Sequence, residues 1–181
     1  MRYNGIMTNA VTLRDPRVLT AYHEAGHTVM AHLCGQIVTT VEIVGDEEHT
    51  GSVSSLRFLE EPRWGLDKHM PSAAIEARIL CLVAGIAAES ILTGHSSWRE
   101  PEDDLDEAVR LALRVVGSCD RVLPLLEEAR DHAVDLLDRH WNAIEILAGL
   151  LLIHRRLTRD QLRQAMAASL EPELGFPDQA A

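Results

Sequence analysis

Residues 23 to 27 read His-Glu-Ala-Gly-His, and this pentapeptide constrains the chain more than any other feature. Side chains four residues apart lie on the same face of an α-helix, so His23 and His27 can bind one Zn²⁺ ion together. The intervening Glu24 projects about 100° round the helix axis, near enough to act on a water molecule at the metal. The sequence therefore predicts a helix here and a fold that brings further ligands to it.

The rest of this predicted helix places both histidines at the border of its apolar face. Asp15-Pro16 is typical of a helix start and Gly35 of a helix end, which gives a helix from residue 15 to about residue 34. On a helical wheel the apolar arc is made by Val18, Leu19, Tyr22, Ala25, Gly26, Val29, Met30 and Leu33. The histidines fall just beyond this arc, so we expect a metal in a cleft that is open to water on one side. The alternative is a pair of boundary histidines held by hydrogen bonds.

A catalytic zinc usually takes three protein ligands and keeps one position for water. Met30 and Leu33 stand where a metzincin would need Gly and the third His, so the third ligand must come from elsewhere. Asp104 is the candidate, because it falls on the inward face of a helix predicted from Pro101 to about residue 116. A carboxylate aimed into a core is costly unless something neutralises it. The alternatives are that Asp104 caps its helix or pairs with a buried histidine, and that His95 is the ligand.

Glu89 is a second carboxylate in an apolar setting, within a helix predicted from about Pro71 to Thr93. Three roles stay open for it: a ligand in place of Asp104, a partner that fixes one imidazole, or a core residue bonded to backbone. The imidazole partner is our first choice. On the wheel of the third helix, the apolar residues that share the inward face with Asp104 are Leu105, Ala108, Leu111, Ala112, Val115 and Val116. The polar residues on its outward face are Asp103, Asp106, Glu107, Arg110 and Arg114.

Hydrophobic periodicity predicts a mainly α-helical domain over residues 15–169 with one small β-hairpin or ribbon. The hairpin is expected from two segments rich in Val, Ile, Thr and Ser, residues 37–44 and 52–59. Further helices are expected at about residues 124–140, 142–153 and 158–169, the last opened by a capping box from Thr158 to Gln161. We expect residues 1–14 to be a flexible arm and residues 170–181 a disordered acidic tail.

Composition excludes several classes of protein. A net charge of −11 without a basic stripe argues against nucleic-acid binding. Lys68 is the only lysine and lacks the Gly-Lys-Ser/Thr setting of a Walker A phosphate loop, so these residues encode no ATP-driven motor. The longest apolar run, residues 79–92, is too short to span a membrane. Three separated cysteines are interpreted as buried thiols in a reducing compartment, and we expect a cytoplasmic domain.

Three stretches of the chain resemble segments of one known family. Residues 21 to 28 read Ala-Tyr-His-Glu-Ala-Gly-His-Thr, residues 82 to 90 read Leu-Val-Ala-Gly-Ile-Ala-Ala-Glu-Ser, and residues 103 to 108 read Asp-Asp-Leu-Asp-Glu-Ala. In this order they resemble the zinc-binding helix, the Gly-Gly-Arg-x-Ala-Glu-Glu segment and the Asn-Asp-Leu-x-x-Ala segment of the peptidase domain of FtsH-type ATP-dependent zinc metalloproteases. The resemblance covers about residues 18 to 168.

The resemblance implies a helical, FtsH-like zinc metallopeptidase domain that stands alone, without the family's ATPase module and membrane anchor. It implies that Asp104 is the third zinc ligand beside His23 and His27. Glu24 would be the general base in the hydrolysis of unfolded or flexible polypeptides. The chain departs from the family at Ile86 and Ser90, which replace an Arg and a Glu, and in a short segment after the third helix where the family has a longer one.

Other functions stay open at this point. The chain could be a non-catalytic zinc-binding interaction module, since a peptidase cleft without an unfolding motor reaches only unfolded or disordered chains. It could also be the hydrolytic subunit of a separately encoded ATPase. Self-association into a homo-oligomer is left open.

Overall fold

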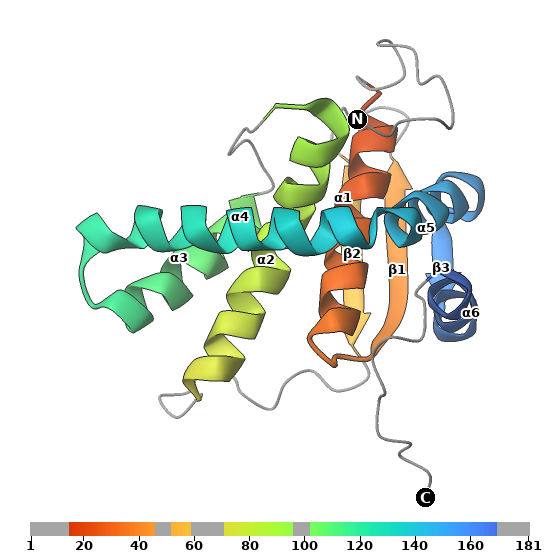
Figure 1. Cartoon of the computed structure of the whole chain (residues 1–181). Helices are drawn as coiled ribbons and strands as arrows, with labels where there is room; N and C mark the ends of the chain where they lie inside the picture. The colour runs from red at the N-terminus through yellow and green to blue at the C-terminus, as the bar shows by residue number, and fades with distance from the viewer. Residues whose placement is uncertain (1–14, 46–51, 59–70, 96–101, 170–181) are drawn as a thin grey trace, which may run out of the picture.

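The computed structural model describes residues 15–45, 52–58, 71–95 and 102–169 (Figure 1). Over these residues the chain is mainly helical with a small sheet, which confirms the predicted fold class. The helices are α1 (Pro16–Leu33), α2 (Ser72–Thr93), α3 (Glu102–Val116), the 3₁₀ turn η2 (Cys119–Arg121), α4 (Val122–Arg139), α5 (Trp141–His154) and α6 (Arg159–Ser169). The strands are β1 (Val38–Gly45), β2 (Ser52–Phe58) and β3 (Arg156–Thr158). The arm expected at residues 1–14 and the tail expected at residues 170–181 lie outside the described residues.

Helix α1 begins and ends where the sequence predicts. The Asp15 carboxylate accepts a hydrogen bond from the backbone N–H of Arg17 at 2.9 Å, and Pro16 occupies the first helical position. After the helix, Gly35 takes a φ of +73°, a conformation that side chains disfavour. Local chemistry therefore fixes the length of this helix without help from tertiary contacts.

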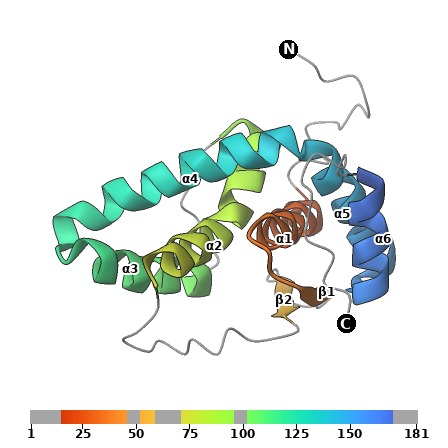
Figure 2. The same ribbon diagram turned by 60° about the horizontal axis from the view of Figure 1, so that its bottom comes forward.

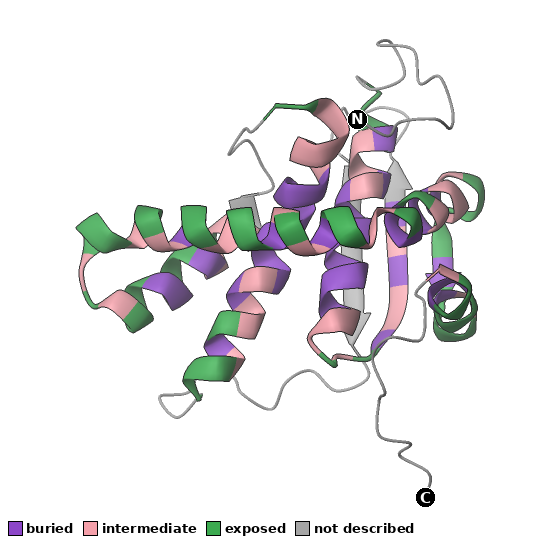
Figure 3. Ribbon diagram, viewed as in Figure 1, coloured by how far each residue is buried: buried purple, intermediate pink, exposed green. Residues whose placement is uncertain are grey.

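Helix α1 lies at the centre of the fold, in contact with α2, α5 and strands β1 and β2 (Figure 2). Every residue from 23 to 31 is buried (Figure 3). The prediction that the two histidines lie only at the edge of the buried face is therefore wrong, because α1 is covered on several sides and not on one. The wheel assumes a single covering layer, whereas α2 covers the polar side of this helix as well.

Helices α1 and α2 approach each other closely at Gly26. A Cβ atom at this position would lie 2.7 Å from the carbonyl oxygen of Ala84 and 2.7 Å from the Cβ of Ala88. Residues 81–88 of α2 are all buried, as the uniformly apolar sequence predicts for a central helix. Small residues on α1 and α2 thus set the distance between the backbones of these two helices.

None of the helices in the described parts of the chain combines the length and apolar character needed to cross a bilayer.

The sheet has the strand order β2-β1-β3, with both neighbours antiparallel to β1. Pairing of β1 with β2 confirms the expected hairpin. The third strand was not predicted: it has three residues, of which only Leu157 is buried, and it pairs with β1 through Val41. A strand this short has too few residues for a periodic signal, and only its neighbour makes it a strand. As predicted for a capping box, Oε1 of Gln161 accepts a hydrogen bond from the backbone N–H of Thr158 at 2.9 Å.

The Gly26 contact generates a prediction about stability. Gly26→Ala is expected to lower the free energy of unfolding by about 1–3 kcal/mol, because the added methyl group meets backbone and a packed side chain. Gly149→Ala in α5 is the matched control, since nothing lies within 4 Å of the added Cβ there. That control should gain up to about 1 kcal/mol from helix propensity. Chemical denaturation measures both, and equal stability of the two variants would contradict the close approach of α1 and α2.

Candidate metal centre

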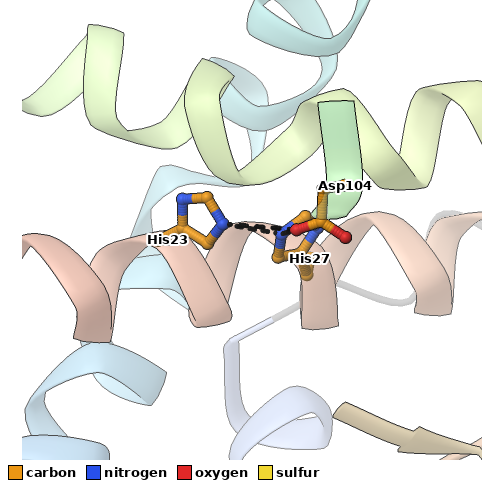
Figure 4. Close-up of side chains that lie close together, drawn as sticks. All are labelled: His23, His27 and Asp104. Atoms are coloured by element: carbon orange, nitrogen blue, oxygen red, sulfur yellow. Dashed lines mark hydrogen bonds and ion pairs between the residues drawn. The ribbon is translucent and has the colours of Figure 1, made fainter. Parts of the chain in front are cut away.

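Three side chains from two distant segments converge beside α2. His23 and His27 stand one turn apart on α1, and Asp104 reaches them from the first turn of α3 (Figure 4). The two Nε2 atoms are 2.9 Å apart. Oδ2 of Asp104 is 3.1 Å from Nε2 of His27 and 3.7 Å from Nε2 of His23. The structure thus brings together the three residues that the sequence singled out, with their ligand atoms all within 4.8 Å of one another.

The other nitrogen of each imidazole is already engaged. Nδ1 of His27 donates to the backbone carbonyl oxygen of Cys81 at 2.6 Å. Nδ1 of His23 donates to Oε1 of Glu89 at 2.8 Å. Of the three roles considered for Glu89, this contact matches that of a partner that fixes one imidazole. Because Nδ1 carries the donated proton in both rings, both Nε2 atoms are left to face the same point.

The spacing and chemistry of these atoms fit a divalent metal. Two imidazole nitrogens 2.9 Å apart repel each other through their lone pairs unless a proton or a cation lies between them. In a tetrahedral zinc site with bonds of about 2.0–2.1 Å, neighbouring ligand atoms lie roughly 3.3 Å apart. The three observed separations of 2.9, 3.1 and 3.7 Å scatter around that value. Two imidazole nitrogens and one carboxylate oxygen are also a donor set that suits Zn²⁺.

Burial makes the site closed on the α1 side and more open at α3. His23 and His27 are 2% and 7% exposed, whereas the side chain of Asp104 keeps 32% of its surface exposed. Burial lowers the pKa of His23, but the carboxylates of Asp104 and Glu89 outweigh it and raise that pKa to about 9. Burial raises the pKa of Asp104, yet its contacts with His23 and His27 hold it well below the usual range. Without a metal, the cluster is therefore held by a proton on His23.

Glu24 is buried beside the histidines, with only 3% of its surface exposed. Its charge acts on His23 and contributes to the raised pKa of that imidazole. Among the residues that the structure describes, none donates a hydrogen bond to the Glu24 carboxylate; Thr28 bonds only to its backbone oxygen. Among the described residues only Gln36 Oε1 is a fully buried side-chain nitrogen or oxygen atom without a partner, so the Glu24 carboxylate keeps contact with solvent and can meet a water molecule.

Gly85 is a site residue that the sequence reasoning missed. A Cβ atom at this position would collide with the imidazole ring of His23, so the ring lies directly against the backbone of α2. The sequence could have indicated this contact. A glycine inside a helix costs about 1 kcal/mol relative to alanine, so its presence in a buried helix indicates a close approach of another group.

The wheel of α3 was right for Asp104 and wrong for two other residues. Glu107, expected on the outward face, is half-buried and paired with Arg78 of α2. Val115, expected on the inward face, is exposed. Helix α3 packs against both α2 and α4, so its buried surface is not the single arc that a wheel assumes.

Two further expectations concern residues near this region. His95, the alternative ligand, is exposed and donates its Nδ1 proton to the carbonyl oxygen of Thr93 at 2.8 Å. It is not part of the cluster. The expectation of three buried thiols holds for Cys81, while Cys34 is half-buried and Cys119 is exposed in the short turn η2. The expectation is therefore wrong for Cys119.

The sequence of this chain is similar to parts of several longer known proteins. No protein-family model matches the chain. It is 25% identical over 185 residues to the ATP-dependent zinc metalloprotease FTSH 11 of Arabidopsis thaliana, a match that covers 88% of this chain and 22% of the relative. The FtsH protein of Rickettsia bellii is 25% identical over 98% of this chain and 34% of its own length. That of Opitutus terrae is 35% identical over 59% of this chain and 16% of its own length.

The chain spans between about a sixth and a third of the length of these relatives. Their names describe whole proteins that are ATP-dependent, and the similarity reaches only part of each. Within the described residues, the cluster of two histidines and an aspartate could hold a metal ion and offers donors that suit zinc. Over most of its length, this chain is homologous to the FtsH-type zinc metalloproteases.

Proposed function

We propose that this chain is a zinc-dependent metalloendopeptidase that hydrolyses peptide bonds of unfolded or flexible polypeptides. The observation that carries the proposal is the convergence of two Nε2 atoms and one carboxylate oxygen, with both Nδ1 atoms already hydrogen-bonded. Homology to zinc metalloproteases supports the same reading of the site. Each residue of the site then has a distinct part in the reaction.

His23, His27 and Asp104 would hold the Zn²⁺ ion. When bound, zinc would supply Lewis acidity, which lowers the pKa of a water molecule at its open position and polarises a peptide carbonyl. Glu89 and the carbonyl of Cys81 hold the two imidazole rings in the orientation that turns both Nε2 atoms toward Asp104. The side chain of Asp104 is 32% exposed, so solvent reaches the site from the α3 side.

Glu24 would be the general base. Its carboxylate takes a proton from the attacking water and later gives it to the nitrogen of the leaving amine. Burial without a protein donor supports this role, because it leaves the carboxylate oxygens able to accept that proton. A module that only binds zinc has no physical need for such a group beside its ligands.

The class of substrate follows from what these residues lack. The relatives are named ATP-dependent, but the 181 residues contain one lysine and no Walker A loop. Any force that unfolds a substrate would come from outside these residues. We therefore propose that the chain acts on polypeptides that are already flexible, or together with an ATPase that lies outside these 181 residues.

Glu24→Gln is expected to keep one zinc per chain and to lower peptide hydrolysis at least about 100-fold, because the amide cannot accept the proton of the attacking water. The measurement is cleavage of a fluorescent unfolded casein, with elemental analysis for zinc. Glu145→Gln, an exposed position on α5, is the matched control and should keep full activity. Full activity in Glu24→Gln would remove this residue from the mechanism. A wild-type protein that binds zinc but cleaves nothing would be a non-catalytic zinc module.

Asp104→Ala is expected to lose zinc, because two imidazoles alone hold the metal weakly. The loss of affinity should exceed the roughly 10–100-fold that removal of a supporting residue typically costs. Asp106→Ala, an exposed position two residues along the same helix, controls for any effect on α3 itself. Equilibrium dialysis followed by elemental analysis measures both variants. Stoichiometric zinc in Asp104→Ala would show that the third ligand is another residue.

Zinc affinity is expected to rise with pH, because zinc must displace the proton that His23 holds in the metal-free site. The pKa of His23 is raised to about 9 by Asp104 and Glu89 against the effect of burial. One displaced proton gives a rise of about tenfold per pH unit below about pH 9 and a plateau above it. Competition with a chromogenic chelator between about pH 6.5 and 8.5 measures the slope. A flat profile over this range would contradict a protonated His23.

A further inference from the structure

An ion pair joins α2 to α3 beside the candidate metal centre. Nε of Arg78 donates to Oε1 of Glu107 and Nη2 donates to Oε2, each at 3.0 Å. Two parallel bonds between planar groups fix their relative orientation as well as their distance. The side chains are 23% and 33% exposed, so solvent screens the pair less than it screens a surface ion pair. This geometry can hold one helix against the other in a defined position.

Glu107 transmits that position to Asp104. The two residues are three apart, so their side chains lie on the same side of α3. Asp104 stands in the first turn of a helix that begins at Glu102, and the first turn has few backbone hydrogen bonds of its own. From residue 104 onward, the first buried apolar side chain of α3 is Ala108. Leu105, which follows Asp104, is half-buried against the core, so the turn that carries Asp104 is held by this one apolar contact and by the polar contacts of its helix.

Arg78 also acts on Asp104 directly through its charge. Burial lowers the pKa of Arg78, but the bonds to Glu107 and the charges of Glu107 and Asp104 raise it above the ordinary value. The guanidinium thus lies close enough to Asp104 for the two charges to attract each other. Both effects draw the start of α3 toward α2.

We propose that Arg78 is a positioning residue for Asp104, acting through its two-bond contact with Glu107. The contact sets the rotation of the first turn of α3, so that Oδ2 of Asp104 reaches the two imidazoles. This inference rests on the proposed function, because it takes Asp104 to be a metal ligand. Helix α2 would then position all three ligand candidates, because it already contacts His23 through Glu89 and His27 through the carbonyl of Cys81.

The test compares Arg78→Gln, Glu107→Gln and the double variant with wild type. Arg163→Gln is the matched control, since it removes the same group from an exposed ion pair with Asp160 on α6. Each single variant should weaken zinc binding about 10–100-fold, as loss of a supporting residue typically does. The double variant should bind zinc no more weakly than whichever single variant binds it more weakly, because both changes remove one shared contact. Arg163→Gln should bind zinc as wild type does.

Two further readouts separate positioning from a general loss of stability. Arg78→Lys keeps the charge without the two-bond geometry, so it too should weaken zinc binding. The visible spectrum of the Co²⁺-loaded protein should change in Arg78→Gln, because Asp104 leaves the metal, and should not change in Arg163→Gln. Circular dichroism identifies variants that remain folded. Wild-type zinc affinity and an unaltered cobalt spectrum in folded Arg78→Gln and Glu107→Gln would overturn the proposal.

A separate measurement distinguishes failure of this proposal from failure of the proposed function. If the wild-type protein binds neither zinc nor cobalt, the proposed function is wrong. Hydrogen exchange in the metal-free protein then tests the positioning by itself. The amides of residues 105–108 should exchange faster in Arg78→Gln and Glu107→Gln than in wild type or Arg163→Gln. Equal rates in all four proteins would overturn the role of the ion pair.

Discussion

The close contact between α1 and α2 is the constraint on which the rest of the structure depends. Gly26 lets the backbone of α1 approach Ala84 and Ala88, and Gly85 lets the imidazole of His23 lie on the backbone of α2. At this distance the polar side of α1 is covered by a helix that offers a carboxylate and a backbone carbonyl as acceptors. Two buried imidazoles would otherwise lack partners for Nδ1, at a cost that hydrogen bonds to α2 remove.

Helix α2 supports the centre without contributing a ligand. Arg78, Cys81, Gly85 and Glu89 recur at spacings of three and four residues, so they form one stripe along the helix. Glu89 and Gly85 orient His23, the carbonyl of Cys81 orients His27, and Arg78 lies next to the helix that carries Asp104. Because these contacts come from a single buried helix, the positions of the three ligand candidates are coupled through one rigid element.

Local sequence predicted the elements well, and it failed where several neighbours meet. The ends of α1 and the capping box at Thr158 follow from side-chain bonds to nearby backbone, which sequence alone specifies. The wheel found Asp104 because a carboxylate on an apolar face is unusual. The same wheel misplaced Glu107 and Val115, since α3 has two packing partners, and it put the histidines at a border although α1 is covered on several sides.

The sequence by itself determined the chemistry of this protein: two histidines one helical turn apart, a glutamate between them and a carboxylate facing the core of a later helix. These follow from helical periodicity, which is a property of each segment alone. Only the tertiary structure decided which nitrogen of each ring faces Asp104, which helix holds the rings, and how Arg78 meets Glu107. Those facts depend on the distance and angle between helices, which arise from packing between segments remote in sequence.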